Sequence, residues 1–343
     1  NWSTVFLLIS GYHTEHQKIR GVSMASHHTA GLQELGNGAY AWLAPSGSWG
    51  WSNAGLIADG DQSLLVDTLF DLELTAEMLK RMREAEPGAR EIGTLVNTHA
   101  NGDHCHGNEL VDGARIIASS ASAAEMSELP PEALAAIMDA AGDLGPAGAY
   151  LLHCFSDFRF NGIHHTPPNE TFDGELELHV GDKPIELIEV GPAHTRGDVL
   201  VHSTADRAVF TGDILFIEGT PIMWQGPVGN WIKACELIEA MDVDHIVPGH
   251  GPITDKAGVA SVRHYLEYIR DQARGRFDAG MTAMEAARDI ELAKYSAWSE
   301  PERIAVNVDT LYREFAGEQA VTDVLELFSR MAELAGFDAS APT

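Results

Sequence analysis

Residues 97–108 constrain the fold of this chain more than any other stretch. They read Asn-Thr-His-Ala-Asn-Gly-Asp-His-Cys-His-Gly-Asn and follow an apolar run, 92–96, that predicts a buried strand. Imidazoles and a carboxylate gathered at a strand end are costly to bury unless something pairs with them. A metal ion fits best, because neutral imidazole and ionised carboxylate are ordinary metal ligands. One short segment rarely supplies a whole ligand set, so His and Asp should recur at later strand ends.

Three later segments repeat this setting. His194 lies in Pro-Ala-His-Thr-Arg-Gly-Asp, Asp213 ends Phe-Thr-Gly-Asp, and His250 lies in Ile-Val-Pro-Gly-His-Gly-Pro. Each stands beside Gly or Pro where the chain turns away from an apolar, strand-like run. Together with the first cluster, these segments resemble the metallo-β-lactamase superfamily, whose ligands follow the order His-x-His-x-Asp-His, His, Asp, His. The match extends from about residue 36 to about residue 270.

The resemblance implies an α/β fold, a four-layer αββα sandwich, here with a C-terminal helical extension. It also implies six metal ligands: His99, Asp103, His104, His194, Asp213 and His250. In the usual arrangement one metal is held by His99, position 101 and His194. The other is held by Asp103, His104 and His250, and Asp213 bridges the two.

Asn101 departs from this pattern, because the superfamily usually has its second His there. An amide oxygen is a weak ligand for zinc, although harder ions accept it. We therefore expect two Zn²⁺ ions with a weaker first site, and Mn²⁺ or Fe²⁺ as alternative metals. His106 could substitute for the missing imidazole, but the sequence predicts it in the first turn of a helix that begins near Gly107. Cys105 is either a further ligand or a small buried filler beside the site.

The implied chemistry is hydrolysis by metal-bound hydroxide, which forms near neutral pH and attacks a polarised carbonyl. Asp103 and Asn101 are the predicted catalytic residues, the latter as ligand or as oxyanion donor. The chain has no G-x-S-x-G motif that would indicate a serine nucleophile. The expected substrate is an ester, thioester, lactone or β-lactam of an apolar small molecule. The alternatives are an iron-dependent oxidoreductase or sulfur dioxygenase of the same fold, and a non-catalytic binding protein.

Charge narrows the range of partners. The 343 residues include 22 basic and 51 acidic side chains, a formal charge of -29 at pH 7. Nucleic acids and anionic membranes are disfavoured, because phosphate contacts require Lys and Arg. Three cysteines without C-x-x-C spacing imply no disulfide framework, and the apolar run 5–9 is too short for a signal or membrane segment. A cytoplasmic protein acting on a small molecule is expected.

The predicted organisation has three parts. Residues 1–23 are an extension of unclear origin, 24–275 form the metallo-β-lactamase-like domain with an insertion at about 121–165, and 276–343 form a helical extension. It resembles the extensions that some superfamily members use to form a homodimer or to cover the site. Substrate-pocket candidates are the aromatic and Met residues of the loops and the insertion, namely Trp49, Trp51, Phe155, Phe158, Met223 and Trp224. His153, His164 and His165 lack ligand spacing and are predicted to be bystanders.

Hydrophobic periodicity predicts the elements. Strands are expected at 39–44, 55–58, 63–66, 92–96, 115–118, 176–180, 185–190, 199–202 and 243–247. Helices are expected at 69–84, from 107, twice within 121–163, at 230–241, at 259–274 and through most of 282–336 with a break at Pro301. Asp67 follows the third strand, where it either supports the metal site from behind or caps the next helix.

Overall fold

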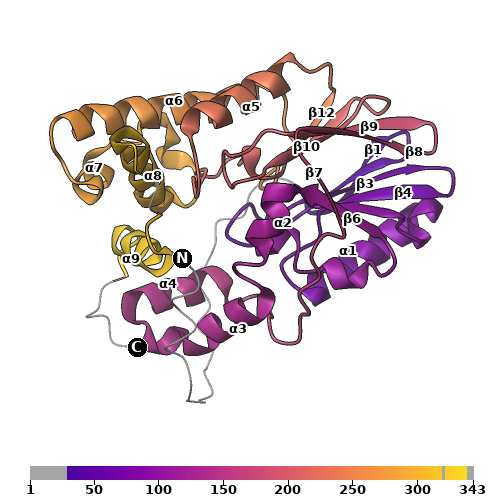
Figure 1. Ribbon diagram of the computed structural model, residues 1–343, viewed down its shortest axis with the longest axis horizontal. Helices are drawn as coiled ribbons and strands as arrows, with labels where there is room; N and C mark the ends of the chain where they lie inside the picture. The colour runs from indigo at the N-terminus through magenta and orange to yellow at the C-terminus, as the bar shows by residue number, and fades with distance from the viewer. Residues whose placement is uncertain (1–28, 319–320, 338–343) are drawn as a thin grey trace.

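The computed structural model describes residues 29–318 and 321–337 (Figure 1), so the predicted extension at 1–23 lies outside the described residues. The described strands form two sheets of seven and five strands. The first runs in the order β1 (Gly31–Gly36), β2 (Ala39–Leu43), β3 (Ala54–Asp59), β4 (Gln62–Val66), β5 (Thr94–Val96), β6 (Arg115–Ser119) and β7 (Glu170–Phe172). The second runs β12 (His245–Val247), β11 (Ala208–Phe210), β10 (Val199–Ser203), β9 (Lys183–Glu189) and β8 (Glu175–Val180).

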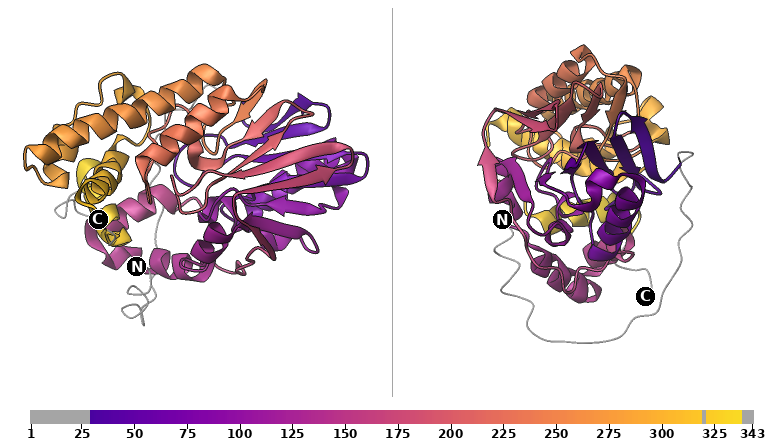
Figure 2. Two further views of the ribbon diagram at one scale, coloured as in Figure 1. Left: turned by 45° about the horizontal axis from the view of Figure 1, so that its top comes forward. Right: turned by 90° about the vertical axis from the view of Figure 1, so that its right-hand side faces the viewer.

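The sheets face each other across an apolar core and carry helices on their outer faces. Side chains such as Ile57, Val96, Leu187 and Val201 are fully buried between the sheets. On the outer face of the first sheet, α1 (Leu72–Ala85) buries Met78 and its neighbours. Over the second sheet lie α5 (Val228–Ala240) and α6 (Lys256–Asp278) (Figures 1 and 2). The predicted four-layer α/β sandwich with helices beyond it is thus confirmed.

Parallel pairing determines where chemistry can gather. Strands β4, β5 and β6 are parallel to one another, and β11 is parallel to β12. The carboxyl ends of parallel strands meet at one edge of a sheet, and binding residues concentrate in the loops that leave this edge. The segments that follow β5, β11 and β12 carry the predicted ligands.

Two groups of helices cover that edge. The insertion forms α2 (Ser120–Met126), α3 (Pro131–Ala140) and α4 (Gly145–Phe155). The C-terminal part forms α7 (Ala283–Asp289), the short turn η8 (Pro301–Arg303), α8 (Ile304–Ala316) and α9 (Val324–Leu334). α9 packs directly on α4, and the two lie side by side in Figures 1 and 2. No helix in the described ranges combines the length and apolar character that crossing a bilayer requires.

Several predicted elements differ from the observed ones. The helix expected from Gly107 is wrong: the segment forms only the 3-10 turns η3 (Gly102–His104) and η4 (Asn108–Leu110). The buried Asn108 side chain bonds the side chain of Asn97 and the backbone of Thr166, which holds the chain in a loop. The insertion contains three helices instead of two, and strands β1 and β7 were not predicted.

Candidate metal centre

The six predicted ligands meet at the carboxyl edge of the sheets. His99, Asp103 and His104 follow β5, His194 lies between β9 and β10, Asp213 follows β11, and His250 follows β12. All six side chains are buried, with exposed fractions of 0 to 9%. Two groups of three have ligand atoms within 4.8 Å of one another: His99, His104 and Asp213, and Asp103, His104 and His250.

Asp213 stands at the middle of the cluster. One carboxylate oxygen, Oδ1, lies 3.1 Å from His104 Nε2, and the other, Oδ2, lies 3.3 Å from His194 Nε2 and 3.5 Å from His250 Nε2. His99 Nε2 is 3.6 Å from the same Oδ2. A β-carbon at residue 249 would overlap Asp213 Oδ1, so Gly249 is what lets the His250 loop approach this closely.

Hydrogen bonds on the outer side fix the orientation of two imidazoles. Asp67 accepts from the Thr98 N–H at 2.7 Å, from the Thr98 hydroxyl at 2.7 Å and from His104 Nδ1 at 2.9 Å. The Thr98 hydroxyl has given its only proton to Asp67, so it must accept from His99 Nδ1, 3.0 Å away. In their neutral form both imidazoles therefore carry their proton on Nδ1 and turn the Nε2 lone pair toward the centre. Asp67 supports the site and does not cap α1, whose N-cap is Asp71.

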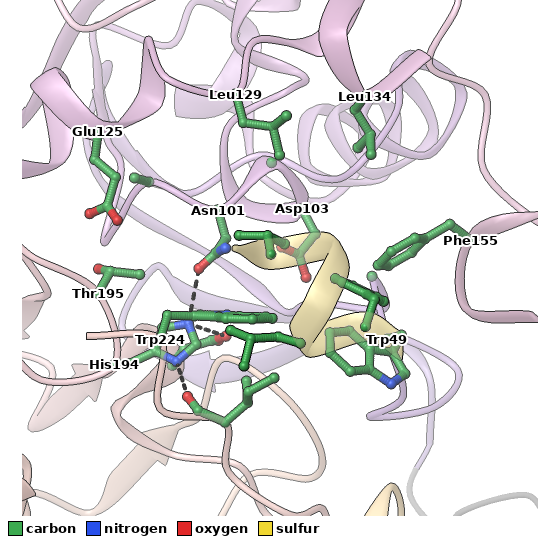
Figure 3. Close-up of a pocket in the computed structure, with 18 of the residues that line it drawn as sticks. Trp49, Asn101, Asp103, Glu125, Leu129, Leu134, Phe155, His194, Thr195 and Trp224 are labelled. Atoms are coloured by element: carbon green, nitrogen blue, oxygen red, sulfur yellow. Dashed lines mark hydrogen bonds and ion pairs between the residues drawn. The ribbon is translucent and has the colours of Figure 1, made fainter. Parts of the chain in front are cut away.

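His194 and Asn101 face each other in a way that a simple hydrogen bond does not satisfy. His194 Nδ1 lies 2.6 Å from the Ile222 carbonyl, which can only accept, so Nε2 carries the lone pair. Asn101 Oδ1 lies 2.9 Å from that Nε2 (Figure 3). Two lone pairs at this distance repel unless a cation lies between them or the amide is turned over. Asn101 thus occupies the place that the sequence pattern assigns to a second His.

The charges of the cluster favour a cation. Burial would raise the pKa of Asp213, but the neighbouring imidazoles, His250 foremost, hold it well below its usual range. Burial opposes protonation of His250, yet the Asp213 carboxylate raises the pKa of His250 to about 9. Burial likewise would raise the pKa of Asp103, but His104 and His250 together lower the pKa of Asp103 to about 2. The cluster therefore holds ionised carboxylates that attract a cation, and a His250 proton that a metal ion can displace.

Buried polar atoms without hydrogen-bond partners also indicate that the cluster binds a cation. His99 Nε2, His104 Nε2 and Asp213 Oδ1 are buried and have no hydrogen-bond partner among the described residues. Buried polar atoms are nearly always satisfied, so orphans that converge on one point indicate an unseen ligand. Imidazole nitrogen and carboxylate oxygen are donors that divalent ions such as zinc accept. The residues present therefore fit a metal centre.

Other candidates lie outside the two groups. Cys105 Sγ donates to the Asn101 carbonyl at 3.4 Å, burial raises the pKa of its thiol, and it belongs to neither group of three ligands. His106 packs against Phe70, with ring centroids 5.5 Å apart, and burial lowers its pKa to about 4. His153 and His164 are exposed and His165 is half-buried; none belongs to either group.

A cavity of about 620 Å³ opens onto the cluster. Of the pocket candidates, Trp49, Phe155 and Trp224 line it (Figure 3). Trp51, Phe158 and Met223 do not. Trp51 packs on Phe158 with centroids 4.9 Å apart, and the buried Met223 is held through its backbone by residues of α8.

Part of the lining was not predicted from sequence. Leu134 of α3 and Leu325 and Phe328 of α9 contribute to the wall, and Glu125 and Arg196 form an ion pair at 3.4 Å on it. The apolar spacing of the tail indicated helices with buried faces, and covering of the site was one of two roles that the resemblance implied, but the sequence did not show which residues would face the cavity.

Comparison with known proteins supports the assignment of the fold. The model of the metallo-β-lactamase superfamily matches residues 47–250. A beta-lactamase-like protein 2 homolog of Caenorhabditis elegans is 30% identical over 102 residues, which cover 30% of this chain and 33% of the nematode protein. A probable metallo-hydrolase of Methanocaldococcus jannaschii is 22% identical over 228 residues, covering 64% of this chain and 97% of that protein.

Solved structures share the fold at low identity. The inverting sec-alkylsulfatase Pisa1 of a Pseudomonas species superposes with a TM-score of 0.63 at 16% identity, covering 84% of this chain and 50% of that chain. A metallo-beta-lactamase from Pontibacter korlensis gives a TM-score of 0.52 at 17% identity, covering 70% of this chain and 99% of that chain. The chain thus spans about a third of the nematode relative and half of the alkylsulfatase.

Proposed function

Because the chain belongs to the metallo-β-lactamase superfamily, we propose that it is a zinc-dependent hydrolase of a carboxylic ester, thioester, lactone or β-lactam in an apolar small molecule. One observation carries the proposal: the Nε2 atoms of three imidazoles converge with carboxylates in a buried cluster, and Asp103, His194, Asp213 and His250 of this cluster face a cavity with many apolar side chains. A divalent cation bound there supplies Lewis acidity and lowers the pKa of water toward neutrality.

The chain's own residues hold this centre in place. Asp67 fixes His104 directly and His99 through Thr98, and the Ile222 carbonyl fixes His194. Such outer hydrogen bonds orient metal ligands and set their tautomer. The Nε2 atoms therefore face the centre before any ion arrives, which limits the rearrangement that binding requires.

Asn101 and the aromatic residues act on the substrate. With Oδ1 turned toward His194, Asn101 Nδ2 has no hydrogen-bond partner in the described ranges and can donate to a substrate oxygen. Donors aimed at a developing negative charge are effective where water is excluded. Trp49 and Phe155, both buried, supply that exclusion on the wall of the cavity.

A hydrolysis panel tests the proposal. Metal-analysed protein is assayed against p-nitrophenyl esters, acyl thioesters, lactones, a chromogenic cephalosporin and a secondary alkyl sulfate. We expect turnover of at least one carbonyl substrate and none of it after His250→Ala. A protein that holds iron, is coloured and hydrolyses none of these compounds would instead support an oxidoreductase.

A further inference from the structure

The cavity above the metal cluster extends between the insertion and the C-terminal helices. We infer that it lodges the unbranched hydrocarbon chain of the substrate, so that α9 and the insertion together select long-chain esters. This inference rests on the proposed hydrolase and adds the class of substrate. The volume, about 620 Å³, lies within the range of roughly 300–1,000 Å³ that is typical of small-molecule pockets.

Four aromatic side chains on the wall of the cavity contact one another. Trp49 is in ring contact with Phe155, Trp224 and Phe328, at centroid distances of 5.8, 6.4 and 5.7 Å. Phe328 also contacts Phe155 at 6.1 Å and Trp224 at 6.3 Å. Trp49 lies in the loop between β2 and β3, Phe155 in α4, Trp224 in the loop after Asp213, and Phe328 in α9. All four line the cavity. Rings arranged in this way give a flexible chain a smooth apolar passage.

Aliphatic side chains line another part of the cavity. Leu134 and Ile137 of α3, Leu151 of α4 and Leu325 of α9 all face the cavity, joined by Leu129. In Figure 3, Leu129 and Leu134 lie on the side opposite His194 and Trp224. Five aliphatic side chains in this lining favour a hydrocarbon chain over a sugar, a peptide or a nucleotide.

The charged groups of the cavity outside the metal cluster have partners, although one atom, Arg303 Nε, is buried without a hydrogen bond among the described residues. Arg196 binds Glu128 at 2.7 Å and Glu125 at 3.4 Å. Arg303 is buried, donates to the Thr220 carbonyl at 3.0 Å and lies over Trp49, with Cζ 4.2 Å from the ring centre. Apart from the metal ligands and His106, these are the charged or titratable side chains among the described residues that line the cavity. An uncharged chain is therefore the occupant that matches the wall.

The C-terminal helices are held firmly against the site. Asp309 of α8 binds Arg330 of α9 at 2.6 Å, with both side chains largely buried. Asn307 of α8 donates to the Pro221 carbonyl at 2.8 Å and accepts from the Met223 N–H at 2.8 Å, in the loop that follows Asp213. The α9 wall is thus fixed relative to the metal ligands, so the cavity is formed before the substrate enters.

The reaction is ordinary ester hydrolysis: water adds to the carbonyl carbon, the carbon–oxygen bond to the leaving group breaks, and a carboxylic acid and an alcohol are released. The chain length of the acyl group is the variable. Each buried methylene contributes about 0.8 kcal/mol, which corresponds to roughly a fourfold rise in kcat/KM. We expect at least a hundredfold rise between the butyrate and decanoate esters of p-nitrophenol, assayed below their critical micelle concentrations.

Two matched variants on the neighbouring helices locate the effect. Leu325→Trp fills the cavity from α9 and should lower the decanoate-to-butyrate ratio of kcat/KM at least tenfold. Leu152→Trp places the same side chain on the exposed face of α4, outside the lining, and should leave that ratio as in the wild type. A ratio that does not change in Leu325→Trp, in a protein with a wild-type melting temperature, overturns the inference.

A binding measurement separates this inference from the proposed function. The non-hydrolysable probe 12-bromododecanol quenches tryptophan fluorescence on contact, and we expect quenching that falls when Trp49 and Trp224 are each replaced by Phe. Quenching without hydrolysis of any ester would refute the hydrolase and keep the chain-binding cavity. Ester hydrolysis with the same kcat/KM at every chain length, and no quenching, would refute the chain-binding cavity and keep the hydrolase. The same result is expected if another segment of this chain fills the cavity.

Discussion

Asp67→Asn removes the hydrogen bond that orients His104, and also the one from the Thr98 hydroxyl through which Asp67 orients His99, with little change in shape. The side chain keeps its size, and Asn tolerates the left-handed backbone at residue 67, where φ is 62°. Asp67 Oδ2 accepts from both the Thr98 hydroxyl and His104 Nδ1, at 2.7 and 2.9 Å. An amide nitrogen at that place donates instead of accepting, so the His104 Nδ1 proton loses its partner and the Nε2 tautomer becomes favoured. That proton then stands where a metal must bind.

The expected loss can be estimated from general behaviour. Removing the partner that orients a metal-bound His typically lowers metal affinity 10- to 100-fold, or about 1.4 to 2.7 kcal/mol. His104 belongs to both ligand groups, so the loss should affect every bound ion. Zinc affinity is measured by competition with a chromophoric chelator, and the melting temperature of the metal-free protein is recorded separately.

A control separates orientation from general stability. Asp206 is another buried carboxylate, paired with Lys183 Nζ at 2.7 Å, at the opposite end of β11 from Asp213. Asp206→Asn should lower the melting temperature without changing zinc affinity. If Asp67→Asn kept wild-type zinc affinity, or if Asp206→Asn weakened it equally, the argument that Asp67 acts through the His104 tautomer would be refuted.

Three further predictions concern the ligands and the ions. Asp213→Ala and His250→Ala, at proposed ligands, should abolish metal binding and most activity. Ala at His153, His164 or His165 should preserve both. If elemental analysis showed as much metal loss in one of these three variants as in the ligand variants, the assignment would be wrong. Asn101→His should raise the affinity of the weaker ion in calorimetric titration, and two equally tight ions in the wild type, unchanged in the variant, would contradict this. Protein stripped of metal by a chelator should melt at a lower temperature than metal-loaded protein, because an ion at about 1,000 times its Kd stabilises the native state by about 4 kcal/mol. Equal melting temperatures of the two forms in calorimetry would show that no bound ion stabilises the fold.

The sandwich and the candidate ligands could be predicted because their signals are local. Each candidate follows a short apolar strand and stands beside Gly or Pro, so its place at a sheet edge follows from the segment around it. The error at Gly107 arose where local spacing was overridden: side-chain bonds of Asn108 to Asn97 and Thr166 hold a loop where periodicity indicated a helix. Such bonds join residues far apart in the sequence and leave no periodic trace.

The cavity wall also depends on contacts between distant parts of the chain, which the local sequence does not reveal. Trp49 and Trp224 lie in loops beside predicted ligands, so their position near the site could be inferred, whereas Phe328 lies far from any ligand along the chain. Its helix was predicted, but the face against which it packs depends on Asp309, Arg330 and α4. The predicted homodimer through the C-terminal helices, the cytoplasmic location and the identity of the metal stay predictions.

Removal and return of metal tests the central claim most directly. The best ester from the panel is assayed with native protein, with protein dialysed against chelator until no metal is detected, and with the same protein after addition of zinc or manganese. We predict that hydrolysis disappears with the metal and returns in proportion to the ion bound, because the chain's histidines and carboxylates form a ligand set and offer no G-x-S-x-G nucleophile. Full hydrolysis by protein shown to contain no metal would contradict the account.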